Sequence, residues 1–267
     1  MFAYEKLINA QQENNSGLCL GLDVDINKIP SYLSHSLDGL YNFNCNIIEA
    51  TSDLVCAYKL NSAFYEQYGA EGIKVLKKTL EYIPSHLFTI VDAKRGDIGN
   101  SSVAYATFCF DYLDADSVTI SPYMGQDSIE PFLRFNNKMA FSLALTSNPG
   151  SEDFQKLKVG DDYLYKIVVE KSMKWAPAFR LGYVVGATKP EELSDLRKIA
   201  KDRIFLIPGV GTQGGNIQQV IKANQNGLAM INVSRDIIYA GKDDTFLESA
   251  RDKAFYYKTE INNARLS

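Results

Sequence analysis

Asp92, Lys94 and Asp97 lie close together in the segment FTIVDAKRGDIGNSS at positions 88–102. The first half of this segment is apolar and rich in strand-forming residues, which predicts a β-strand over 88–94. Alternate side chains of a strand project from the same face, so we expect Asp92 and Lys94 to lie together at its end. Because buried charge is costly unless it is paired, this concentration of charge beside an apolar strand indicates a functional role.

The chemistry that fits this set is proton donation beside a fixed negative charge. A carboxylate keeps a nearby lysine protonated, since the two groups at about 4 Å attract by roughly 4 kcal/mol at an effective dielectric of about 20. Lys59, at the end of the preceding predicted strand, can join the set. A protonated lysine fixed in this way can protonate a developing carbanion, and the carboxylates can oppose a substrate's own negative charge.

The same residues allow other interpretations. They could form an ion-pair network that only closes the fold, or they could hold a Schiff-base lysine or a metal. A Schiff-base lysine needs a lowered pKa, whereas neighbouring carboxylates raise it. A divalent ion at Asp92 and Asp97 would be repelled by Lys94, and no histidine or third local carboxylate completes a site. We therefore expect no metal.

A glycine-rich segment, PGVGTQGG at 208–215, precedes a predicted helix. Glycines let the backbone approach a ligand closely, and free amides at a helix start favour an anion. Arg235, after the next predicted strand, can bind phosphate oxygens with two nitrogens. The alternative is a flexible turn with a surface arginine. The glycines also match G-x-G-x-x-G, but a dinucleotide fold needs more βαβ units than the one strand and one long helix that follow.

Strand and helix patterns alternate along the whole chain. The expected strands are 18–24, 56–60, 88–94, 117–121, 140–146, 180–186, 204–208 and 228–233. The expected helices are 39–54, 61–82, 101–113, 126–135, 163–175, 191–200, 216–223 and 245–257. Eight such units predict an α/β chain folded as a single-domain (β/α)8 barrel, the TIM barrel, over residues 1–267. The carboxyl ends of its strands would bring Asp23, Lys59, Asp92, Lys94, Ser147 and Arg235 to one rim.

Composition narrows the class of protein further. The net charge is −4 and no run of basic residues occurs, so we expect no nucleic-acid partner. The four scattered cysteines are expected to be buried free thiols, and neither His35 nor His86 lies in a polar cluster. The longest uncharged run, 204–221, contains several glycines and amides, so it is not a membrane span, and no secretory signal is recognisable. A cytoplasmic location is the expectation.

The segment DAKRGDIGNS at 92–101 resembles the D-x-K-x-x-D signature of the orotidine 5′-phosphate decarboxylases. Other segments are similar to this family in the same order: LCLGLDVD, AYKLNSAFYEQYG, TSNPGS, IPGVGTQGG and NVSRDIIY. The resemblance covers most of the chain and is greatest to the bacterial branch that carries DAKRGDIG. It implies a homodimer of barrels that needs neither cofactor nor metal. Such an enzyme converts orotidine 5′-phosphate to uridine 5′-phosphate and carbon dioxide in pyrimidine biosynthesis.

The resemblance also implies a role for each matching residue. Lys94 would donate the proton to C6 of the pyrimidine, Asp92 and Lys59 would complete the charged network, and Asp97 would reach into the partner's site. Asp23 and Lys59 would hold the ribose hydroxyls, Ser147 the pyrimidine, and Gly211, Gln213 and Arg235 the phosphate. Ser101 stands where the family commonly has threonine and would contact the partner's ribose. The alternatives are a related sugar-phosphate lyase or synthase and a catalytically silent nucleotide-binding protein.

Overall fold

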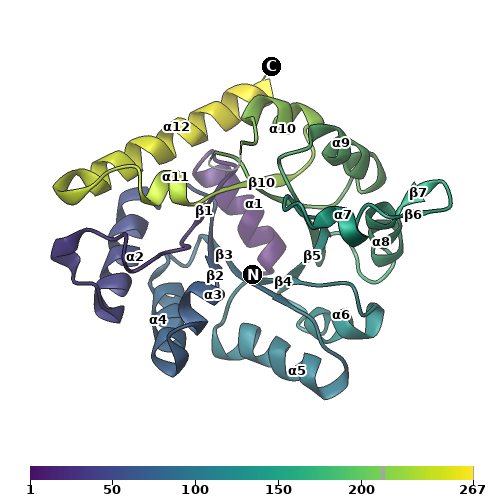
Figure 1. Cartoon of the computed structure of the whole chain (residues 1–267), viewed down its shortest axis with the longest axis horizontal. Helices are drawn as coiled ribbons and strands as arrows, with labels where there is room; N and C mark the ends of the chain where they lie inside the picture. The colour runs from purple at the N-terminus through teal and green to yellow at the C-terminus, as the bar shows by residue number, and fades with distance from the viewer. Residues whose placement is uncertain (212–213, 267) are drawn as a thin grey trace.

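Eight parallel strands form a closed barrel surrounded by helices (Figure 1). The computed structural model of the chain describes residues 1–211 and 214–266. The barrel strands are β1 (Leu18–Gly21), β2 (Ala57–Asn61), β3 (Phe88–Arg95), β4 (Ser117–Ile120), β5 (Met139–Leu145), β8 (Leu181–Val185), β9 (Phe205–Pro208) and β10 (Ala229–Val233). They follow one another around the barrel in chain order, and β10 pairs with β1. The predicted (β/α)8 barrel is confirmed; that it is a single domain stays a prediction.

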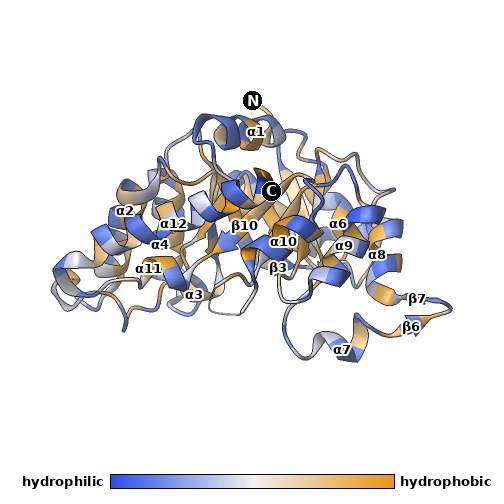
Figure 2. Ribbon diagram, turned by 90° about the horizontal axis from the view of Figure 1, so that it is seen from above, coloured by the Kyte–Doolittle hydropathy of each residue, from blue (hydrophilic) through white to orange (hydrophobic). Residues whose placement is uncertain are grey.

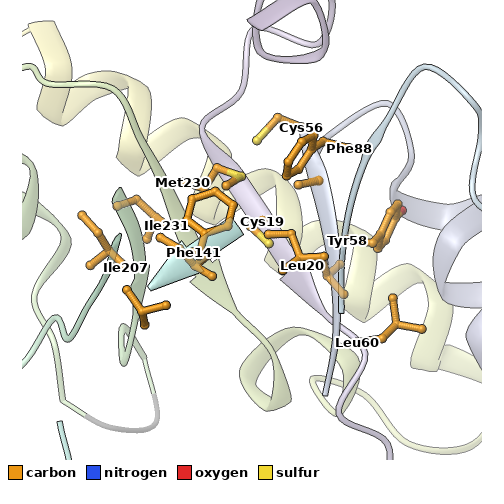
Figure 3. Close-up of a cluster of buried hydrophobic side chains, with 14 of the residues drawn as sticks. Cys19, Leu20, Cys56, Tyr58, Leu60, Phe88, Phe141, Ile207, Met230 and Ile231 are labelled. Atoms are coloured by element: carbon orange, nitrogen blue, oxygen red, sulfur yellow. The ribbon is translucent and has the colours of Figure 1, made fainter. Parts of the chain in front are cut away.

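The strands are short apolar segments buried on both faces. Every residue of β1, β4, β8 and β10 is buried, as expected for parallel strands enclosed by helices. Figure 3 shows part of the resulting core, in which side chains from distant strands meet. Among them are Cys19, Tyr58, Phe88, Phe141 and Met230. All four cysteines are free and buried, as predicted.

The outer layer consists of helices that bury one face against the barrel. Those that follow the strands are α2 (Leu37–Thr51), α4 (Gly69–Tyr82), α5 (Gly99–Thr107), α6 (Gln126–Leu133), α8 (Leu164–Ser172), α9 (Pro190–Ile199), α10 (Ile217–Ala223) and α12 (Phe246–Leu266). In α4, for example, Val75, Leu76 and Leu80 are buried while the lysines face solvent. Ser36 begins α2, where its hydroxyl accepts a hydrogen bond from the backbone N–H of Gly39 at 3.1 Å.

Several predicted boundaries were wrong for local reasons. The expected helix 61–82 is divided into α3 (Ala63–Glu66) and α4, because Gly69 has a φ of +64°. The helix expected over 101–113 starts earlier, at Gly99, and continues after Thr107 as a π-helical turn over Phe108–Tyr112. The expected loop 147–160 contains α7 (Ser151–Phe154) and leads into a small hairpin, β6 (Lys158–Val159) with β7 (Asp162–Tyr163).

A helix that was not predicted, α1 (Ala3–Glu13), covers the amino ends of the strands. Lys6 forms a salt bridge with Asp116 at 2.7 Å, just before β4, and Gln11 donates to the carbonyl of Ala229 at 3.0 Å. Figure 2 shows α1 on one side of the barrel, opposite α7 and the hairpin. Because α1 closes this end, access to the barrel interior is from the carboxyl ends of the strands.

Within residues 1–211 and 214–266, none of the helices combines the length and apolar character that crossing a membrane requires. A cytoplasmic location stays a prediction from the sequence.

Candidate active site

A cavity of about 390 Å³ opens at the carboxyl ends of the strands. Six of the ten predicted site residues line it: Asp23, Lys59, Asp92, Lys94, Ser147 and Arg235. They lie in or after five different strands, β1, β2, β3, β5 and β10, so only the closed barrel brings them together. The cavity therefore combines the predicted charged set with the arginine of the predicted phosphate site.

The floor of the cavity is an alternating chain of charges. Asp92 lies between two lysines, with Oδ2 at 3.0 Å from Nζ of Lys59 and Oδ1 at 2.7 Å from Nζ of Lys94. Lys59 also lies 3.4 Å from Oδ1 of Asp23. The Lys59 side chain is only 4% exposed, whereas that of Lys94 is 46% exposed and faces the open side of the cavity.

The ionisation of this chain follows from the balance of burial and charge. Burial alone would favour neutral Asp92, but Lys59 and Lys94 outweigh it, and the pKa of Asp92 lies well below its ordinary value. Burial likewise opposes the charge on Lys59, but Asp23 and Asp92 raise the pKa of that lysine above its ordinary value. The network thus holds a carboxylate and a buried ammonium group in their charged forms across the neutral range.

A bulge in β3 produces the close contact between Asp92 and Lys94. Val91 pairs with Val118 and Arg95 with Ile120, so three residues of β3 lie opposite the single residue Thr119 of β4. Lys94 has a φ of +48°, in the left-handed region. The expected proximity of the two side chains is present, but it does not arise from the regular alternation that the sequence suggested.

Asp23 is held at its position by the neighbouring strand. Its Oδ1 accepts a hydrogen bond from the backbone N–H of Asn61 at 3.3 Å, in addition to its contact with Lys59. Asn61 itself lines the cavity at the end of β2. The carboxylate of Asp23 thus stays beside the ammonium group of Lys59 at the rim.

The described residues of the glycine-rich segment, 208–211 and 214–215, follow β9 and approach one another closely. Gly209 and Gly211 have φ values of +104° and +84°, and the N–H of Gly215 donates to the carbonyl of Gly209 at 3.0 Å. Gly209 and Arg235 line the cavity, whereas Gly211 is not among its lining residues, and an added Cβ at Gly211 would be 2.7 Å from Oη of Tyr257. Gln213, also predicted to hold phosphate, lies outside the described residues.

Ser147 reaches the cavity from the segment that follows β5. This segment is fixed by Gln155, whose side chain accepts from the N–H of Thr146 and donates to its hydroxyl, both at 2.8 Å. Nζ of Lys156 forms salt bridges with Glu152 at 2.8 Å and with Glu192 of α9 at 2.6 Å. The segment that carries Ser147 is thereby tied to the next unit of the barrel.

Asp97 and Ser101 do not line the cavity of their own chain. Asp97 follows β3, and its Oδ1 accepts from the N–H of Ile98 at 2.8 Å. Ser101 is exposed on the first turn of α5. These two predicted residues therefore do not contribute to the cavity of their own chain.

The polar residues of the cavity that the sequence interpretation did not name as site residues include Asn61, Thr119 and Asn232. Each lies at or near the end of a predicted strand, which is the signal that could have identified them. Thr119 donates to Oδ1 of Asp92 at 2.8 Å, and the Asn232 side chain accepts from the Cys19 thiol at 3.6 Å. In the part of the chain that the structure describes, no three His, Cys, Asp or Glu side chains are grouped to hold a metal ion.

Comparison with known proteins gives consistent matches over the whole barrel. The profile of the orotidine 5′-phosphate decarboxylase / HUMPS family matches residues 16–250. The orotidine 5′-phosphate decarboxylase of Christiangramia forsetii is 51% identical over 247 residues, 91% of each chain. That of Flavobacterium johnsoniae is 49% identical over 93% of each chain. The solved structure of Leishmania donovani OMP decarboxylase superposes with a TM-score of 0.89 at 35% identity, covering 100% of both chains.

Proposed function

We propose, on the premise that this chain belongs to the orotidine 5′-phosphate decarboxylase / HUMPS family, that Lys94 is the acid of its reaction. The reaction is the decarboxylation of orotidine 5′-phosphate to uridine 5′-phosphate in pyrimidine biosynthesis. The observation that carries the proposal is the position of Asp92 between the ammonium groups of Lys59 and Lys94, at 3.0 and 2.7 Å.

The proposed step needs a cation and a proton at one carbon. As the bond between C6 and the carboxylate breaks, carbon dioxide leaves and its bonding electrons stay on C6. The ammonium group of Lys94 lies on the open side of the cavity and gives a proton to that carbon, which leaves a neutral amine that solvent reprotonates. Asp92 holds the ammonium group of Lys94 in place through their contact at 2.7 Å and opposes the negative charge of the substrate's carboxylate until that charge departs.

The other cavity residues bind the parts of the nucleotide that do not react. Arg235 and the backbone at Gly209 hold the phosphate, and Gly211 and Gln213 add to that binding. Asp23 and Lys59 hold the ribose hydroxyls, and Ser147 contacts the pyrimidine. Phosphate binding far from C6 can then stabilise closure of the segments that carry Ser147 and Gly209 over the substrate. Binding energy from the phosphate is thereby used where the bond breaks.

An absorbance assay on orotidine 5′-phosphate tests this function. We expect the purified protein to consume the substrate in buffer containing a metal chelator and no added cofactor. Binding of uridine 5′-phosphate without turnover would instead identify a silent nucleotide-binding protein. A strict requirement for magnesium would favour the related sugar-phosphate chemistry.

We further propose a homodimer in which Asp97 reaches the partner's site and Ser101 contacts the partner's ribose. Both residues lie outside their own cavity although Asp97 is only three residues from Lys94. Large apolar side chains around them are exposed to solvent, which a second copy of this surface would cover. They are Ile98, Val103, Tyr105, Tyr123 and Met124.

Mixing two inactive variants tests the shared site. In a hybrid of Lys94→Ala and Asp97→Ala subunits, one site carries both changes and the other carries neither. If exchange at equal amounts is random, half of the dimers are hybrids, and activity should recover to about a quarter of the wild-type value. No recovery after demonstrated subunit exchange would contradict the proposal that Asp97 acts across the interface.

A further inference from the structure

We propose that Thr119 is a positioning residue for the decarboxylation, because its hydroxyl fixes both the carboxylate of Asp92 and the backbone of Lys94. The inference rests on the proposed function and deepens it. Thr119 is 1% exposed, in the centre of β4, and it lines the cavity beside the charged network.

The bulge in β3 creates the need for such a residue. Asp92, Ala93 and Lys94 together lie opposite Thr119, so the backbone of β4 does not pair with these residues in the regular register. The N–H of Lys94 donates instead to the side-chain oxygen of Thr119, at 2.9 Å. The hydroxyl thus replaces a hydrogen bond that a regular ladder would supply.

The same hydroxyl also orients the carboxylate. It donates its own proton to Oδ1 of Asp92 at 2.8 Å, and this is the oxygen that contacts Nζ of Lys94 at 2.7 Å. A hydroxyl can accept one hydrogen bond and donate another, which a methyl group in its place cannot. One atom of Thr119, its hydroxyl oxygen, therefore positions Lys94 twice. It binds the backbone N–H of Lys94 directly, and it positions the ammonium group through Asp92.

The backbone of Lys94 depends on this support. A lysine at φ +48° occupies a sparsely populated conformation that persists only where its surroundings hold it. Without the hydroxyl, the N–H of Lys94 loses its partner and the bulge can relax, which would move the ammonium group away from C6. The phosphate-binding residues lie across the barrel, after β9 and β10, so the binding of the nucleotide should change little.

The test compares Thr119→Val with Thr119→Ser, which keeps the hydroxyl. We expect kcat for orotidine 5′-phosphate to fall about 10- to 100-fold in Thr119→Val, as for an acid displaced by a fraction of an ångström to 1 Å. KM and the Kd of uridine 5′-phosphate should stay within about threefold of wild type, and Thr119→Ser should keep kcat within about threefold.

Thr89→Val provides a matched control. Thr89 makes the same pair of hydrogen bonds at the opposite end of the same strand pair, donating to Asp116 and accepting from its N–H, both at 2.9 Å. This variant should lose stability without a selective loss of kcat. If Thr119→Val does not fold, the kcat ratio of Thr119→Ser to Thr119→Ala isolates the hydroxyl in the same way.

Three results would overturn the inference while the wild type still decarboxylates its substrate. They are an unchanged kcat in Thr119→Val, an equal loss of kcat in Thr119→Ser, and an equal loss in Thr89→Val. Absence of turnover by the wild-type protein would instead contradict the proposed function, so the two failures can be told apart.

Discussion

Replacing Asp92 with asparagine should destabilise the folded chain as well as impair its reaction. The substitution keeps the shape of the side chain and removes its charge from between Lys59 and Lys94. At 3.0 Å and an effective dielectric of about 20, the attraction between Asp92 and Lys59 is about 5 kcal/mol. Removing one partner of a buried pair typically costs about 3–5 kcal/mol, because the other charge is left uncompensated. Asp23 still contacts Lys59, so we expect the lower end, about 3 kcal/mol.

Urea unfolding of wild type and Asp92→Asn measures this difference, provided that the slope of the transition is unchanged. Glu71→Gln is a matched control, since Glu71 pairs with Lys74 at 2.7 Å but both side chains are at least 60% exposed. The loss of unfolding free energy in Glu71→Gln should be too small to measure, because solvent screens the attraction between exposed charges. If Asp92→Asn were as stable as Glu71→Gln, the buried network would contribute nothing to folding and the reasoning from its burial would be refuted.

Two further predictions follow from the site. Gly211→Ala should raise KM for orotidine 5′-phosphate at least about tenfold, because the new Cβ meets Oη of Tyr257 at a φ of +84°; steady-state kinetics with unchanged KM would contradict this. The stability difference between wild type and Asp92→Asn should be full above about pH 4 and disappear as pH falls through the lowered pKa of folded Asp92. Because the pKa of Lys59 is raised in the folded chain, the contribution of Lys59 to stability is complete below about pH 10. It is lost only as pH rises through the pKa of folded Lys59. Urea titrations across pH measure both limits, and an acid limit above pH 4 would be inconsistent with the lowered pKa.

The sequence predicts the barrel because its signals are local and repeated. Apolar strand segments alternate with helical spacing eight times, and polar residues such as Asp23, Lys59 and Asp92 stand where strands end. A closed parallel barrel puts all those ends on one rim, so their convergence follows from topology alone. The helix α1 was missed because its apolar residues, Leu7 and Ala10 among them, are few and gain their burial only from the finished barrel.

The details of the site depend on contacts between strands, which a sequence does not display. The bulge at Asp92–Lys94 and the positive φ of Lys94 arise from the register of β3 against β4. Thr119 looks like any strand threonine until that register is known. Asp97 and Ser101 carry the family motif, yet they lie outside the cavity of one chain, so their predicted roles require a partner subunit.

The most direct test of the central claim is the turnover of orotidine 5′-phosphate by Lys94→Ala. The variant should still bind uridine 5′-phosphate, because Arg235 and the backbone at Gly209 are untouched, and this binding controls for folding. Loss of the acid that protonates C6 should lower kcat/KM by at least about 10³-fold in the absorbance assay. Turnover within about tenfold of wild type would show that Lys94 is not the proton donor and would contradict the account.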